Sequence, residues 1–272
     1  MTSSHDIPSA QIPRPPTRRF ASVRTIVALV LREMATTYGR SPGGYIWAVL
    51  EPAGGIALMS LIFSLAFRTP ALGVSFPIFY ATGLVPFMFF TNISQKVSSS
   101  LLFSKQLLAY PTVTFIDAIL ARFILNVITQ LLVGYVIFVG IIMIFDTRVM
   151  PDLATIAQTY ALVTLMTLGI GVLNCFLMSR FSVWKSAWSI LTRPLFIISC
   201  IFFLFEGVPQ PYRDWLWYNP LVHIVGLMRR GFYPSYDATY VSVPYVAGVG
   251  MITLVIGLLL LRRYHRDLLN SV

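Results

Sequence analysis

Residues 112–145 read TVTFIDAILARFILNVITQLLVGYVIFVGIIMIF, a run of 34 residues with only two charged side chains, Asp117 and Arg122. A helix of about 20 apolar residues crosses the roughly 30 Å of hydrocarbon in a bilayer. This run is therefore long enough to span a membrane and too long for one straight crossing. We expect its first turns, residues 112–122, to project into the cytoplasm.

The composition of the whole chain agrees with a membrane location. Hydrophobic residues make up 57% of the 272 residues and charged residues only 11%, whereas soluble domains carry about 25%. The net charge is +10, but the basic residues stand at the ends of apolar runs, whereas a nucleic-acid-binding protein gathers them on a polar face. We therefore predict an integral membrane protein without a nucleic-acid partner.

Five further apolar stretches accompany residues 112–145. They are residues 45–67, 76–96, 153–179, 184–205 and 241–261. Together the six predict an all-α integral membrane protein with six transmembrane helices. Before the last span, residues 207–238 contain four prolines, and their apolar piece, 221–228, is too short to cross. We expect re-entrant outer helices there, which must be buried in protein or line a wet cavity.

The N-terminal region is different in kind. Residues 1–19 are rich in proline and arginine and have no apolar core, which predicts a disordered cytoplasmic tail and not a cleaved signal. Residues 20–38 carry apolar side chains at helical spacing with charges elsewhere on the wheel, which predicts an amphipathic helix lying in the membrane interface. Residues 20–272 then form a single transmembrane domain.

The distribution of basic residues orients the chain. With both termini in the cytoplasm, 13 Lys and Arg residues lie on the inner side, 5 on the outer side and 2 within spans. This agrees with the positive-inside rule. A seventh crossing at residues 221–228 would move Arg262, Arg263 and Arg266 outside, so we interpret that piece as re-entrant.

No enzyme chemistry is visible in the sequence. A phosphate-binding loop needs Gly-x-x-x-x-Gly-Lys-Ser/Thr, and Lys185-Ser186, where a lysine precedes a hydroxyl residue, lacks both glycines. The histidines and cysteines show no ligand spacing: they are His5, His223, His265, Cys175 and Cys200. We expect no metal, disulfide or cofactor in this chain, so energy for uphill transport must come from another chain or an ion gradient.

The connector at about residues 98–109 is a candidate docking helix. Its serines can cap a helix, and it is apolar although a cytoplasmic connector need not be. It either docks into a partner's groove or lies against the membrane surface. The candidate residues are Ser99, Ser100, Leu101, Leu102, Phe103, Lys105, Leu107 and Leu108.

Polar residues inside the spans form a second group. Arg122, Asn126 and Gln130 recur every four residues and share a helix face, so they either line a pathway or bond neighbouring helices. Arg193 lies nine residues after Trp184 and near Trp188, about 13 Å deep at the rise of a helix. It either meets an anion in transit or pairs with an internal acid.

The outer segment before the last span is crowded with aromatic rings. Such rings commonly anchor the membrane interface, but aromatic rings also stack on sugars, and arginine binds carboxylates and phosphates. We interpret this segment as a candidate outer gate. The candidate residues are Trp215, Trp217, Tyr218, His223, Arg229, Arg230, Phe232 and Tyr233.

Three motifs give the chain a family resemblance. They are Tyr38-Gly-Arg-Ser41, Gly44-Tyr-Ile-Trp47 followed by Glu51-Pro52, and Arg229-Arg-Gly-Phe-Tyr-Pro-Ser-Tyr236 after Tyr218-Asn-Pro-Leu-Val-His223. Together with the order of spans, they resemble ABC exporter permeases of the polysaccharide type, most of all those that export capsular polysaccharide. Gly226 departs from the pattern, because relatives commonly carry Glu there.

The resemblance implies a homodimer that encloses a canal and docks two copies of a separate ATPase subunit, which binds ATP and Mg. The substrate would be an acidic capsular polysaccharide on a lipid, moved across the inner membrane toward periplasmic and outer-membrane export proteins. Arg24, Arg32 and Arg40 would collect the acidic linker, although lipid headgroups could bind the same charges. Trp47 is a further candidate residue of the substrate path.

Three other functions remain open at this level. Permeases for O-antigen or teichoic-acid-type polymers are similar to capsule permeases. A secondary transporter driven by an ion gradient commonly carries acidic residues within the membrane, but Glu51, Asp117 and Glu206 lie near span ends, and no convincing repeat is found. A membrane enzyme acting on a lipid-linked sugar is the third, but no acidic metal site is visible.

Overall fold

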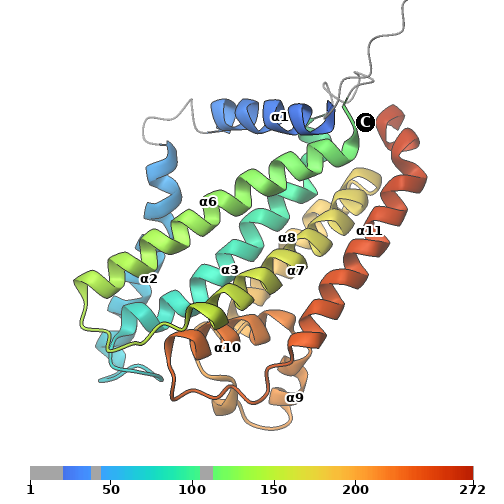
Figure 1. Ribbon diagram of the computed structural model, residues 1–272. Coiled ribbons are helices and arrows are strands. Elements are labelled where there is room, and N and C mark those ends of the chain that lie inside the picture. Colours follow the sequence, from blue (N-terminus) through green and yellow to red (C-terminus); the bar gives the residue numbers. More distant parts are fainter. Residues whose placement is uncertain (1–20, 38–43, 105–112, 272) are drawn as a thin grey trace, which may run out of the picture.

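The computed structural model describes residues 21–37, 44–104 and 113–271, and every regular element in these ranges is helical. The long helices are α1 (Ala21–Thr37), α2 (Gly44–Ala66), α3 (Phe76–Ser98), α6 (Phe115–Ile144), α7 (Leu153–Arg180), α8 (Trp184–Ile198) and α11 (Val243–Ser271). The short ones are α4 (Ser100–Phe103), the 3-10 turn η1 (Phe205–Gly207), α9 (Tyr212–Trp217) and α10 (Pro220–Phe232). Figure 1 shows their arrangement.

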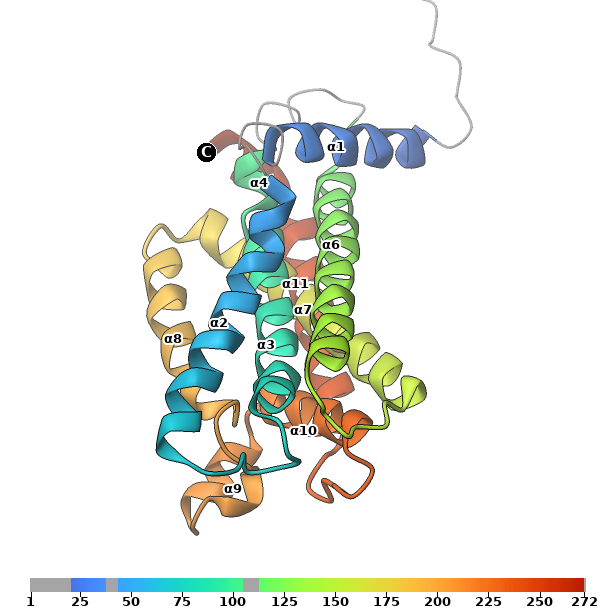
Figure 2. The ribbon, with the colours of Figure 1, turned by 90° about the vertical axis from the view of Figure 1, so that its left-hand side faces the viewer.

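The helices form a bundle that is closed at both ends by helices of another orientation. Helix α1 lies across one end, over the first turns of α6, and α9 and α10 lie at the opposite end (Figures 1 and 2). The predicted interface helix therefore exists as a helix that runs across the bundle. The predicted tail, residues 1–19, lies outside the described residues.

Five of the described helices are long and apolar enough to cross a membrane: α2, α3, α6, α7 and α11. The predicted all-α membrane fold is confirmed. The predicted span at residues 184–205 forms a regular helix only to Ile198, because Cys200 adopts a positive φ of 57°, which a continuing helix does not allow. At 15 residues, α8 is about 22 Å long. The total of six crossings stays a prediction.

Helix α6 begins where the sequence supplies a cap. The hydroxyl of Thr114 accepts a hydrogen bond from the backbone N–H of Asp117, and the Asp117 carboxylate accepts one from the backbone N–H of Thr114. This reciprocal capping box satisfies two N–H groups at a helix start. The helix therefore begins at Phe115, three residues later than the apolar run alone predicted.

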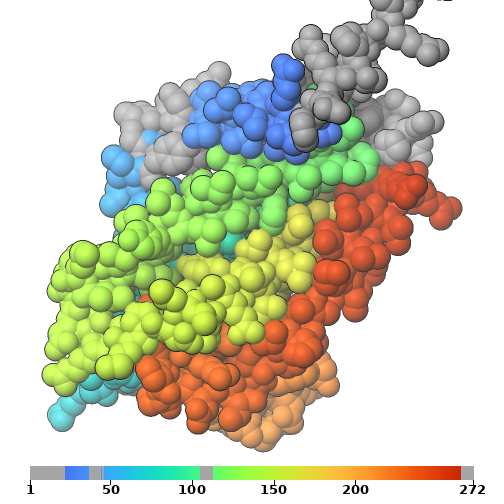
Figure 3. Space-filling view, viewed as in Figure 1, coloured from blue at the N-terminus to red at the C-terminus, as the bar shows by residue number. Residues whose placement is uncertain are grey.

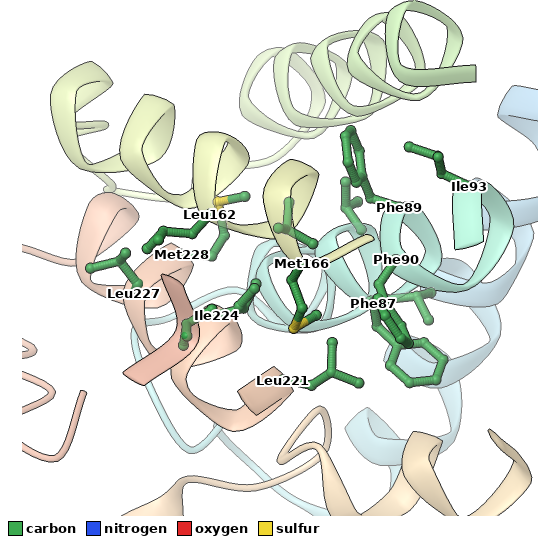
Figure 4. Packing of buried hydrophobic residues seen from close by; sticks show 14 of the residues in the cluster. Phe87, Phe89, Phe90, Ile93, Leu162, Met166, Leu221, Ile224, Leu227 and Met228 are labelled. Atoms are coloured by element: carbon green, nitrogen blue, oxygen red, sulfur yellow. The ribbon is translucent and has the colours of Figure 1, made fainter. Parts of the chain in front are cut away.

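The core is centred on α3, which packs against α2, α6, α7 and α10. Figure 4 shows side chains from α3, α7 and α10 interdigitating, and those it labels are Phe87, Phe89, Phe90, Ile93, Leu162, Met166, Leu221, Ile224, Leu227 and Met228. Because α10 contributes this many buried side chains, this part of the outer segment belongs to the bundle core and is not a surface loop.

Small residues bring α7 and α11 together. A side chain added at Gly169 would collide with the backbone oxygen of Gly250, and one added at Gly257 would meet the backbone of Leu173 at 2.7 Å. Glycines allow such close approach between helices that pack within a membrane. Helix α11 consequently lies directly against α7, and Figure 3 shows both on the same face of the molecule as α6.

Candidate coupling segment, polar cleft and outer segment

The connector after α3 forms the single-turn helix α4 at the same end of the bundle as α1 (Figure 2). Ser100 and Leu101 point inward and are buried, whereas Leu102 and Phe103 are 42% and 40% exposed. Leu101 therefore belongs to the core, and Leu102 and Phe103 form the exposed apolar surface of α4. Lys105, Leu107 and Leu108, predicted for the same surface, lie outside the described residues.

Directly behind α4 lies a buried ion pair. Nε of Arg122 donates to Oε1 of Glu33 at 2.9 Å, and a second guanidinium nitrogen donates to Oγ of Ser99 at 3.2 Å. The guanidinium carbon lies 4.2 Å from the centre of the Phe103 ring. The ion pair is shielded from solvent, since its two side chains are only 6% and 4% exposed.

The remaining members of the polar stripe lie further along α6. The side-chain amide of Asn126 donates to the backbone oxygen of Arg122 at 2.7 Å, and Gln130 is half-buried. Arg122 thus bonds neighbouring elements, as the helix-packing interpretation of this stripe requires, whereas Asn126 bonds the backbone of its own helix. A pathway-lining role for the stripe stays a prediction.

A polar cleft of about 550 Å³ opens between α3 and α8. Helix α8 contributes Lys185, Trp188 and Arg193, and the facing side of α3, together with the residue that follows it, contributes a stripe of polar side chains. That stripe consists of Thr91, Ser94, Gln95, Ser98 and Ser99. Two predicted path residues from one helix, Trp188 and Arg193, are thereby brought opposite Ser99 of the predicted coupling segment.

The cleft is electropositive. None of the described residues that line it is acidic, and within the described part of the chain neither Lys185 nor Arg193 forms an ion pair. Both cations are exposed, and Trp188 is half-buried between them along the helix. The described residues thus supply no acidic partner for Arg193, and its contact with an anion in transit stays a prediction.

Part of the outer segment is locked into the core. Arg229 is fully buried and donates to the backbone oxygens of Phe203 at 2.9 Å and Ile201 at 2.8 Å, with its guanidinium over the ring of Phe79. Phe232 and Tyr233 are also buried. Arg229 thus ties α10 to α3 and to the segment that follows α8, and all three side chains are shielded from solvent in this conformation.

His223 joins α10 to the end of α9 and to the residues just before α11. Its Nδ1 accepts a hydrogen bond from the backbone N–H of Ser242, which leaves Nε2 to donate to the backbone oxygen of Trp217 at 2.8 Å. The indole N–H of Trp217 in turn donates to the backbone oxygen of Tyr240. Burial lowers the pKa of His223 below its ordinary value, so the neutral ring is favoured.

The exposed residues of the outer segment are those available to a substrate. Trp215 and Tyr218 are 80% and 70% exposed, and Arg230 is exposed at the end of α10.

Gly226 is explained by Tyr240, because a side chain added at Gly226 would collide with the Tyr240 hydroxyl. The tyrosine therefore occupies the space that a larger residue at this position would need.

Comparison with known proteins places this geometry in a family. Residues 24–233 match the ABC-2 type transporter family. The chain belongs to this family. It is thus a transporter membrane subunit and not a catalytic domain.

Relatives of this ABC-2 chain include polysaccharide exporters. The chain is 32% identical over 247 residues to the polysialic acid transport protein KpsM of Escherichia coli, an alignment that covers 91% of this chain and 96% of KpsM. It is 25% identical over 243 residues to the capsule polysaccharide export inner-membrane protein CtrC of Neisseria meningitidis, with 89% and 92% covered. The corresponding protein BexB of Haemophilus influenzae is 25% identical over 244 residues, with the same coverage.

The predicted entry residues of the ABC-2 chain are dispersed. Arg24 on α1 and Trp47 on α2 are exposed, and Arg32 lies beside the Phe103 ring, with 5.6 Å between guanidinium carbon and ring centre. Arg40 lies outside the described residues. The described entry residues therefore surround the end of the bundle and do not form one pocket.

Sequence reasoning missed several residues of these sites. Gln95 and Lys185 line the cleft, and Glu33 pairs with Arg122. The polar stripe on α3 could have been found, because its members recur at helical spacing within an apolar span. The pairing of Glu33 had no local signal, since 89 residues separate it from Arg122.

Proposed function

We propose that this chain is the membrane subunit of an ATP-driven exporter that moves lipid-linked acidic capsular polysaccharide from the cytoplasm across the inner membrane. Two copies form the canal, and two copies of a separate ATPase subunit, which bind ATP and Mg, supply the energy. Both termini lie in the cytoplasm. Periplasmic and outer-membrane proteins continue the path outward.

The observation that carries this proposal is the electropositive cleft between α3 and α8. Lys185 and Arg193 lie on the same helix, and the described lining contains no carboxylate to neutralise them. An acidic polymer or a phosphate-containing linker has the charge that such a lining attracts. The likeness to a polysialic acid transport protein supports the same substrate class, since that relative aligns over nearly the whole chain.

The cleft also suits a substrate that must keep moving. Trp188 offers a flat ring to sugar faces, and Arg193 supplies charge, but the α3 hydroxyls of Thr91 and Ser94 already donate to carbonyls of their own helix. Contacts to the polymer are therefore few and interchangeable. Such a lining holds each sugar weakly, as a processive path requires.

We place the ATPase contact at α4. Leu102 and Phe103 are exposed apolar side chains at the end of the bundle where α1 lies. An exposed apolar patch of this kind fits a groove on a partner protein. The excess of basic residues assigned to this side supports a cytoplasmic location, where ATP is available.

The test is disruption of the gene in its own organism, followed by location of the polysaccharide. Accumulation inside the cell supports export, whereas loss of synthesis points to an enzyme and an unchanged surface polymer refutes both. Complementation with Arg193→Ala should reduce surface polymer while the protein level is maintained. The matched control is Arg68→Ala, since Arg68 is an exposed arginine outside the cleft.

The identity of the retained polymer separates the remaining transporter functions. Retention of a capsule-type polymer supports the proposal. Retention of an O-antigen or a teichoic-acid-type polymer assigns the chain to one of those exporters instead. Transport by the purified chain alone, driven by a proton or sodium gradient, would refute an ATP-driven mechanism.

A further inference from the structure

At the end of the bundle that carries α4, four side chains form a cluster that we call the polar joint: Glu33, Arg122, Ser99 and Phe103. Helix α1 has one acidic residue, Glu33, and instead of facing water it is turned inward and is only 4% exposed. It meets Arg122 of α6, which is 5% exposed. An exposed ion pair would be weak and easily exchanged with water, but a pair desolvated to this degree has a fixed geometry.

Arg122 contacts a different element with each part of its guanidinium. Nε binds Glu33 of α1, and a terminal nitrogen binds Ser99 between α3 and α4. The flat face stacks on Phe103 of α4. The planar fork of arginine allows these contacts to form at once, which a lysine ammonium cannot reproduce.

Phe103 connects this buried joint to the surface. Phe103 is 40% exposed, and the centre of its ring lies 4.2 Å from the guanidinium carbon of Arg122. Arg32 of α1 lies near the same ring, at 5.6 Å. A displacement of Phe103 therefore acts directly on both Arg122 and α1.

We propose that Arg122 is a positioning residue that couples α4 to α1. Through it, a push on Phe103 from the ATPase partner shifts α4, the start of α6 and α1 as one body. Ser99, which binds Arg122, also lines the polar cleft, so the same movement reaches the substrate path. This inference rests on the proposed function, because it assumes that the ATPase docks on α4.

The experiment uses the full-length chain with its ATPase partner in liposomes, with ATP hydrolysis and polymer export measured on the same sample. Arg122→Gln removes the charge and keeps a shorter, uncharged polar side chain. We expect the partner to remain bound and ATP to be hydrolysed, with export per ATP reduced by about tenfold. Arg122→Lys should recover part of this loss, and Arg68→Gln, outside the joint, should behave as wild type.

Two results would overturn the inference. One is normal export per ATP in the Arg122→Gln chain. The other is loss of export only in proportion to lost partner binding, which would indicate a docking or folding defect. If Arg122→Gln does not fold, the test uses Phe103→Leu, which keeps the exposed apolar surface of α4 and removes the aromatic face. Reduced export per ATP in this variant supports the inference, and normal export per ATP refutes it.

Failure of the proposed function would look different. In that case the wild-type chain itself would neither bind the ATPase nor export polymer. Wild-type coupling together with normal coupling in the variants would reject the role of Arg122 alone.

Discussion

Replacement of Glu33 by alanine should release α1 from the bundle. The substitution leaves the Arg122 cation buried without its carboxylate, and removal of one partner of a buried ion pair costs about 3–5 kcal/mol. Because Arg122 keeps its contacts with Ser99 and Phe103, we expect a value near the lower end, about 3 kcal/mol. At about 1.4 kcal/mol per factor of ten, this raises the equilibrium constant for opening of α1 roughly a hundredfold.

Hydrogen exchange of the α1 backbone amides measures this opening directly, because exchange reports local unfolding free energies. In the Glu33→Ala chain, protection in α1 should fall about a hundredfold, while that in α7 should stay unchanged. Arg24→Ala is the matched control, since Arg24 is an exposed charge on the same helix. The double substitution Glu33→Leu with Arg122→Met should restore most of the protection, because an apolar pair can replace a buried ion pair.

A change in protection of less than about twofold would refute this reasoning. The pair would then contribute no more than a solvent-exposed ion pair, for which the usual value is about 0–1 kcal/mol. The burial of Glu33 would in that case have no energetic consequence for the position of α1.

Three further predictions follow from the same structure. Leu102→Asp should abolish co-purification of the ATPase partner in detergent, because it puts a charge on the exposed apolar surface of α4, whereas the size-conserving Leu102→Met should retain it. Gly226→Ala should destabilise the outer segment by about 1–3 kcal/mol in thermal unfolding through its collision with the Tyr240 hydroxyl, and adding Tyr240→Phe should recover part of that loss. Because the pKa of His223 is lowered in the folded chain, the unfolded chain binds a proton more readily. The stability that depends on the neutral ring should therefore be lost as the pH falls from about 6.5 through the lower folded pKa. His223→Gln should weaken this dependence of stability on acid, and an unchanged pH profile of unfolding would contradict the prediction.

The sequence by itself determined the membrane class and most helix positions. The predicted spans at residues 76–96 and 153–179 became α3 (Phe76–Ser98) and α7 (Leu153–Arg180). These agree closely because the length of an apolar run and the cost of exposing backbone groups to lipid are local properties. The basic ends of the spans and the family motifs are also read directly along the chain.

Only the tertiary structure decided which side chains meet. It paired Arg122 with Glu33, turned Arg229 into the core and placed the polar face of α3 opposite Arg193. It also ended α8 at Ile198, within a stretch whose hydropathy predicted a longer helix. Contacts between distant segments depend on how whole helices pack, and a local pattern of apolar and polar residues does not specify which helix lies against a given face. For that reason the membrane class and the family were accessible from the sequence, whereas the joint and the cleft were not.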